Sequence, residues 1–134
     1  MTVHEKFKYR SLDEIRADID KFGIELPILE DLGPLKSPIF MKGATIPNSI
    51  GIHPMEGCDG TAQGGPSDLT YRRYERFARG GAGLLWFEAT AVVEEGRANP
   101  RQLYICEENK DELKRLLDRS IEAAQQEYGQ GYKP

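Results

Sequence analysis

The chain has 134 residues, a length that suits one ordinary domain with a sizeable core. Hydrophobic residues make up 39% and charged residues 30%, which argues against a disordered chain, and the net charge of −4 argues against broad binding to nucleic acid or anionic membranes. Only two cysteines are present, Cys58 and Cys106, and their wide separation favours neither a disulfide scaffold nor a metal site.

The N-terminus lacks the apolar segment of a signal peptide, and no apolar run approaches the roughly 20 residues of a membrane span. We therefore expect a cytoplasmic protein with reduced thiols. The first element predicted is a helix over Ser11–Phe22, because Ser11 and Glu14 form a capping box and Gly23 is placed to end the helix. One face of this helix is apolar and consists of Leu12, Ile15, Ile19 and Phe22.

A connector and a hairpin follow this helix. Residues 23–36 contain two prolines, which prevent long regular structure. Residues 38–48 predict a short hairpin in which strand 39–41 pairs with residues 45–46 across a turn at residues 42–44.

The centre of the chain predicts a strand, a long loop, a helix and a second strand. The strands are Ile50–Met55 and Gly83–Glu88, and the helix, Leu69–Arg79, has Ser67 or Asp68 as its N-cap. Because a helix returns the chain between the strands, they must be parallel. We expect the second strand to be buried on both faces, and His53 to be a hydrogen-bonded core histidine.

Two features of this region have an ordinary structural interpretation. The glycines of Gly80–Gly83 end a helix and open a strand, which is the reverse of a dinucleotide-binding fingerprint, so we expect them to turn the backbone. The four arginines of the helix predict a solvated face, because the chain as a whole is acidic.

Two long loops leave the predicted strand ends. Residues 56–68 contain four glycines, whose amides could approach a ligand closely, and residues 89–108 follow the second strand. Loops at the carboxyl ends of parallel strands carry the chemistry of α/β proteins. A last helix begins at Asn109 as N-cap and ends at Gly129, with an apolar stripe of Leu113, Leu116, Leu117, Ile121, Ala124 and Tyr128.

An ordered set of short motifs runs through this region: His53-Pro54-Met55, Gly60, Gly64-Gly65-Pro66, Tyr71-Arg72-Arg73-Tyr74, Gly80-Gly81-Ala82-Gly83-Leu84, Glu88-Ala89-Thr90-Ala91-Val92 and Gly96-Arg97. Together they resemble the start of the Old Yellow Enzyme family of FMN-dependent NADH:flavin oxidoreductases and ene-reductases. The resemblance covers roughly residues 35–109 and implies an α/β fold of the (β/α)8 TIM-barrel type. Such a barrel needs about 250 residues, so we expect this chain to be only its first part.

The resemblance implies a division of the chain into an N-terminal helix and connector, residues 1–36, and a truncated barrel domain, residues 37–134, with a hairpin and the first two β-α units. The full-length parent would pass hydride from NAD(P)H through FMN to an activated alkene or similar small acceptor, with a homo-oligomer as one option. The catalytic residues would lie downstream of Pro134. The isolated chain is expected to be inactive.

Several residues match family positions at the flavin. Pro54 and Met55 correspond to residues that meet the isoalloxazine ring, and Ala89 to one that contacts it through the backbone. Glu56 stands where the family usually has a cysteine or threonine that hydrogen-bonds the flavin, and its carboxylate would repel a reduced, anionic flavin. Cys58 is either a substrate-side residue or a small buried thiol. Arg97 is expected to anchor the second loop.

An alternative of a different class also remains open. A small stand-alone α/β binding or interaction module, without catalysis, would show the same strand–helix alternation. No histidine metal site is expected, because His53 and His4 are the only histidines.

Overall fold

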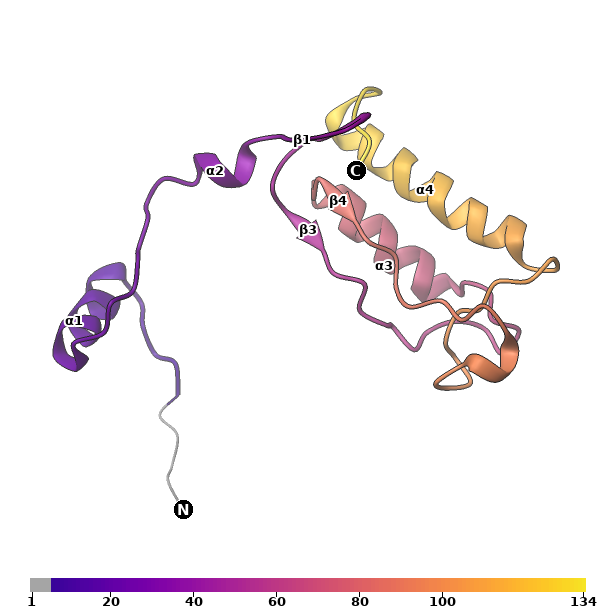
Figure 1. The fold of residues 1–134 in the computed structure, drawn as a ribbon, viewed down its shortest axis with the longest axis horizontal. Coiled ribbons are helices and arrows are strands. Elements are labelled where there is room, and N and C mark those ends of the chain that lie inside the picture. Colours follow the sequence, from indigo (N-terminus) through magenta and orange to yellow (C-terminus); the bar gives the residue numbers. More distant parts are fainter. Residues whose placement is uncertain (1–5) are drawn as a thin grey trace, which may run out of the picture. The chain divides into compact units, whose positions relative to one another are not determined.

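The computed structural model describes residues 6–134, and His4 lies outside this range. The described chain is a mixed α/β protein (Figure 1). It divides into two compact units, one ending at Asp31 and the other running from Leu32 to Pro134, and each is described separately. No helix within residues 6–134 is both long enough and apolar enough to cross a membrane.

The first unit contains helix α1, Leu12–Phe22, as predicted. The Ser11 hydroxyl accepts a hydrogen bond from the Glu14 backbone N–H at 3.3 Å, which is half of the predicted capping box. The other half differs, because the Glu14 carboxylate accepts from the Arg10 N–H at 2.8 Å. Gly23 ends the helix in the left-handed conformation, with φ of +59°.

The second unit opens with a short helix, α2, Gly33–Lys36, and the predicted hairpin. Strands β1, Ile39–Met41, and β2, Ala44–Ile46, are antiparallel, and Met41 lies opposite Ala44. The turn is therefore one residue shorter than predicted, because Ala44 belongs to the strand. Gly43 has a φ of +85°, as two-residue hairpin turns require.

The predicted parallel pair is confirmed, although both strands are shorter than expected. Strand β3, Gly51–Ile52, pairs in parallel with β4, Leu84–Leu85, and helix α3, Asp68–Arg79, connects them (Figure 1). The Ser67 hydroxyl caps α3 by accepting from the Leu69 N–H at 3.1 Å. The glycines after α3 turn the backbone, as predicted.

Helix α4, Lys110–Tyr128, runs beside α3 (Figure 1). The two helices approach closely through small side chains, since Ala78, Ala123 and Ala124 form the buried cluster against which Leu85 and Tyr132 pack. The predicted apolar stripe is wrong in part, because Leu117 and Tyr128 are about half exposed while Ser120 and Ala123 are buried. The buried Ser120 hydroxyl donates to the Leu116 carbonyl at 2.7 Å.

One face of the β3–β4 pair is open. Leu85 packs on the alanine cluster, whereas Leu84 and Trp86 point to the opposite face, where Trp86 is 63% exposed. The prediction that the second strand is buried on both faces is therefore wrong for this chain. His53 is also exposed, contrary to prediction, and lines an apolar groove on the open face with Gly51, Ile52, Pro54, Leu84 and Trp86.

Candidate functional site

Two long loops leave the carboxyl ends of β3 and β4 and interlock (Figure 1). We call residues 53–67 the first loop and residues 86–109 the second loop. The Gly60 N–H donates to the Arg101 carbonyl at 2.9 Å, and the Tyr104 N–H donates to the Gly64 carbonyl at 3.1 Å. The second loop also folds on itself, through a parallel bridge between Ala91 and Tyr104.

The glycines of the first loop allow the two loops to pack closely against each other. Gly64 has a φ of +77°, and a Cβ atom there would overlap the Tyr104 ring. A Cβ atom on Gly60 would lie 2.8 Å from the Arg101 carbonyl oxygen. Amides of the first loop also bond within that loop, since the Thr61 N–H donates to the Gly65 carbonyl at 2.8 Å. The small residues therefore permit loop packing, and these amides do not form a phosphate cradle.

Arg97 holds the second loop in place, as the resemblance implied. Its guanidinium donates to backbone carbonyls of both loops, namely those of Thr61, Ala62, Pro100 and Gln102. The Tyr104 ring lies beneath it at 5.1 Å. Arg97 is thus engaged in structural contacts on both sides of the interlock.

A partly buried ion cluster joins α3 to both loops. Arg73 donates to both Asp59 carboxylate oxygens, at 3.0 and 2.9 Å, and also pairs with Glu88, whose side chain is only 1% exposed. The Gly57 N–H donates to Glu88 Oε2 at 3.0 Å, and the Glu88 N–H donates to the Tyr74 hydroxyl at 2.7 Å. Arg73 therefore ties the first loop to the beginning of the second loop.

These contacts shift the ionisation of the cluster. Burial alone would raise the pKa of Asp59, but hydrogen bonds from Arg73 and Thr70 outweigh it and hold that pKa below its ordinary value. Burial would likewise lower the pKa of Arg73, yet the bonds to Asp59 and Glu88 raise it above the usual value. The prediction that all four helix arginines form a solvated face is wrong for Arg73.

The residues matched to flavin positions lie at the carboxyl ends of the two strands. Pro54 and Met55 follow β3 after His53 and are exposed, Met55 by 74%. Ala89 lies beyond β4, and its carbonyl accepts from the Gln102 amide at 3.1 Å. These positions offer exposed surface close to the strand ends.

Sequence reasoning missed Asn99, which completes a polar cluster with Glu56 and Cys58. The Asn99 amide donates to Glu56 Oε1 and lies 3.4 Å from the Cys58 sulfur, and the Cys58 thiol donates to Glu56 Oε1 at 3.4 Å. No local pattern could have indicated this contact, since Asn99 lies in the other loop. Cys58 is exposed, which excludes the alternative of a small buried thiol.

The cluster makes the Cys58 thiol less acidic. The hydrogen bond to Glu56 is the main cause of a raised Cys58 pKa, with smaller contributions from partial desolvation and the Glu56 charge, while the Asn99 hydrogen bond lowers it. The Cys58 thiol is therefore less nucleophilic than a free cysteine at neutral pH.

We expect the substitutions Glu56→Gln and Asn99→Ala to change Cys58 reactivity in opposite directions. Glu56→Gln removes the carboxylate that raises the thiol pKa, so alkylation at pH 8 should become faster, by about threefold or more. Asn99→Ala removes a group that lowers the pKa, so alkylation should become slower. The rate of Cys58 alkylation by iodoacetamide is measured in the Cys106→Ser protein and in the same protein carrying Glu56→Gln or Asn99→Ala. Equal rates in all three would show that Glu56 and Asn99 do not influence the Cys58 thiol.

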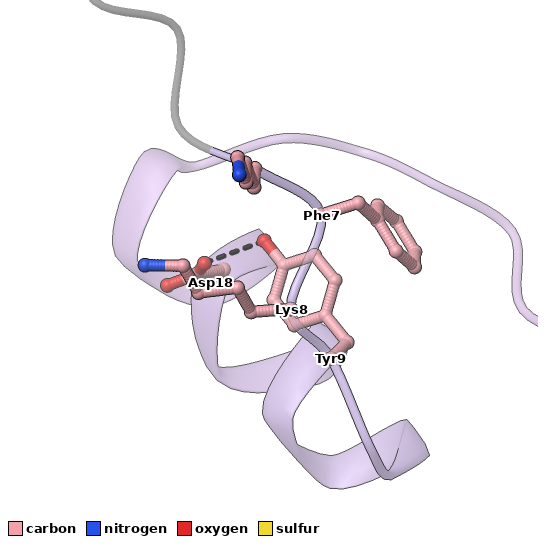
Figure 2. A pocket seen from close by; sticks show the side chains of 5 residues that line it. Phe7, Lys8, Tyr9 and Asp18 are labelled. Carbon is pink, nitrogen blue, oxygen red and sulfur yellow. Dashed lines mark hydrogen bonds between the residues drawn. The ribbon is translucent and has the colours of Figure 1, made fainter.

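A separate hollow lies in the first unit, lined by Lys6, Phe7, Lys8, Tyr9 and Asp18 (Figure 2). Figure 2 shows the Tyr9 hydroxyl directed at Asp18, to which it donates at 2.6 Å. The Phe7 and Tyr9 rings meet edge to face at 4.9 Å. The hydrogen bond from Tyr9 to Asp18 fastens the segment before α1 onto that helix.

Within the described residues, no group of three or more histidine, cysteine, aspartate or glutamate side chains is placed to hold a metal ion. No protein-family model matches the chain.

Proposed function

We propose that this chain supplies the first two strand–helix units of a (β/α)8 barrel that uses FMN to pass hydride from NAD(P)H to an activated alkene or similar acceptor. The observation that carries the proposal is the pair of interlocked loops at the carboxyl ends of two adjacent parallel strands. Barrel enzymes build their active sites at that end of the strands. The order of motifs from His53 to Arg97 supplies the choice of family.

The residues at the strand ends suit a flavin in part. Pro54, Met55 and Ala89 offer exposed apolar and backbone surface of the kind that an isoalloxazine ring packs against. FMN, when bound, would accept hydride from NAD(P)H and deliver it to the acceptor. Glu56 suits the flavin less well, because an ionised carboxylate has no proton to donate and would oppose formation of an anionic reduced flavin.

Asn99 changes what Glu56 can contribute. Its amide already donates to the Glu56 carboxylate, so the pair presents an anion held in one orientation. The side-chain amide of Asn99, in the second loop, thus lies beside Glu56, the position at which the family has a cysteine or threonine. We propose that Asn99 would orient the Glu56 carboxylate when the full-length protein binds a flavin.

The open face of the β3–β4 pair is consistent with the proposal that these strands belong to a larger sheet. Ile52, Leu84 and Trp86 line an apolar groove on the face opposite the alanine cluster. An isolated pair of strands is marginal in water and needs further strands or packing partners. A barrel interior would provide these partners for the groove.

The experiment is to purify the protein at its natural length, measure its flavin content, and follow NAD(P)H oxidation with cyclohexenone as acceptor. We expect bound FMN and turnover, and we expect the 134-residue chain alone to bind FMN more weakly than micromolar, because most cofactor contacts would lie downstream. Met55→Asp should weaken FMN binding by about tenfold or more, which corresponds to about 1.4 kcal/mol.

Val92→Asp is the matched control, because Val92 is exposed to a similar extent in the second loop, at 78%. We expect this variant to bind FMN as the unsubstituted protein does. A natural-length protein without flavin would overturn the proposal and favour the binding-module alternative.

A further inference from the structure

Cys58 has an unusual backbone conformation. Its φ is +49°, and it is the only residue other than glycine with a positive φ within residues 6–134. This left-handed conformation is unfavourable for a residue with a Cβ atom, so contacts around the residue must hold it. The Cys58 side chain is exposed, so packing of the thiol in the interior does not supply these contacts.

Both neighbours of Cys58 are held by the ion cluster beside α3. On the N-terminal side, the Gly57 N–H donates to Glu88 Oε2 at 3.0 Å. On the C-terminal side, the Asp59 carboxylate accepts two hydrogen bonds from Arg73, at 3.0 and 2.9 Å. Because Arg73 also pairs with Glu88, one guanidinium joins the two anchors. Cys58 is therefore the single residue between two fixed points.

The guanidinium of Arg73 is itself closely confined. A Cβ atom on Gly57 would lie 2.1 Å from a terminal nitrogen of Arg73, so the guanidinium packs directly on the Gly57 backbone. The Thr70 hydroxyl, also on α3, donates to the Asp59 carboxylate at 2.8 Å and supports that anchor from the same helix. Side chains of α3, together with Glu88, thus set the course of residues 57–59.

The backbone conformation of Cys58 decides where its thiol lies. The thiol donates to Glu56 Oε1 at 3.4 Å, and the Asn99 amide donates to both side chains. A residue with a φ of +49° directs its side chain differently from one in the common regions of negative φ. If Cys58 relaxed to a negative φ, the thiol would therefore leave Glu56.

We propose that Arg73 is a positioning residue, which keeps Cys58 in its left-handed conformation and the Cys58 thiol on Glu56. Its importance for catalysis rests on the proposed function, in which Glu56 and Cys58 lie where the flavin and the substrate would bind. In that barrel, an arginine of an outer helix fixes two residues of the active site from behind. The coupling between Arg73 and Cys58 requires no flavin.

The test is the rate at which iodoacetamide alkylates Cys58, read by peptide mass spectrometry in the protein at its natural length. Arg73→Lys keeps the charge, but one ammonium cannot make paired bonds to Asp59 and also reach Glu88. We expect the thiol to leave Glu56, so alkylation at pH 8 should become about threefold faster. The pH profile of the rate should shift to lower pH, because the bond to Glu56 raises the Cys58 pKa.

A double-mutant cycle separates positioning from a general effect. Adding Glu56→Gln to Arg73→Lys should change the rate by less than about 1.5-fold, because the contact with Glu56 is already lost. Arg72→Lys is the matched control, since Arg72 is the exposed neighbour of Arg73, and it should leave both the rate and the effect of Glu56→Gln unchanged. Gly57→Ala should also speed alkylation, because its methyl group displaces the guanidinium without changing any charge.

Cys106 is the internal reference for general unfolding, and its alkylation rate should stay the same in every variant. An unchanged Cys58 rate in Arg73→Lys, equal acceleration at both cysteines, or an undiminished effect of Glu56→Gln would overturn the proposal. Flavin content is measured in the same samples. A protein without flavin that shows the coupling would overturn the proposed function and leave the positioning role of Arg73 intact.

Discussion

Replacing Arg73 by methionine should lower the free energy of unfolding by about 3–5 kcal/mol. Methionine keeps much of the side-chain length but leaves Glu88, whose side chain is 1% exposed, without its counter-charge. It also leaves Asp59 unpaired at the base of the first loop. Urea denaturation followed by circular dichroism measures the loss, and the midpoint should shift with little change in slope.

Arg72→Met is the matched control, since Arg72 is the neighbouring arginine on α3 and has no partner within the described residues. It should change the free energy of unfolding by less than about 0.5 kcal/mol. Adding Glu88→Gln to Arg73→Met should recover part of the loss, because a neutral amide needs no counter-charge. Similar losses for Arg72→Met and Arg73→Met would show that the buried cluster does not stabilise the fold.

Replacing Gly64 by alanine should lower the free energy of unfolding by about 2–4 kcal/mol. One part of this cost is the backbone, because Gly64 has a φ of +77° that residues with a Cβ atom rarely adopt. The other part is the Tyr104 ring, which occupies the space that the new methyl group needs. Thermal and urea denaturation both report the loss.

Gly43→Ala separates these two contributions. Gly43 has a φ of +85°, but no atom lies within 4 Å of the position that its Cβ would take. This variant should therefore lose only the backbone part, about 1 kcal/mol. If both variants lost the same amount, the contact between Gly64 and Tyr104 would contribute nothing to stability.

The helices and the hairpin could be predicted because their signals are local. Ser11 and Ser67 cap the helices that follow them, and Gly23 ends the first one. The parallel arrangement of β3 and β4 followed from connectivity, since a helix joins them. The assignment to a flavin-dependent barrel stays a prediction that rests on the order of motifs.

The contacts of the candidate site could not be predicted, because they join residues far apart in sequence. Arg73 looked like its exposed neighbours, and only folding places it between Asp59 and Glu88. Asn99 reaches Glu56 across more than forty positions, and nothing in its own neighbourhood marks it. Strand burial was mispredicted for a related reason, since an apolar run such as 83–88 does not reveal how much of its surface has a partner.

The interlock of the two loops limits how the protein can be re-engineered. Gly64 of the first loop packs against the Tyr104 ring of the second loop, and Arg97 of the second loop donates to carbonyls of the first. The conformation of each loop therefore depends on the other. If only one loop were transferred into a homologous protein, it would lose its contacts with the other loop and would not keep its conformation. Residues 60–65 and 97–104 therefore form a single cassette, to be exchanged together or randomised together in a library.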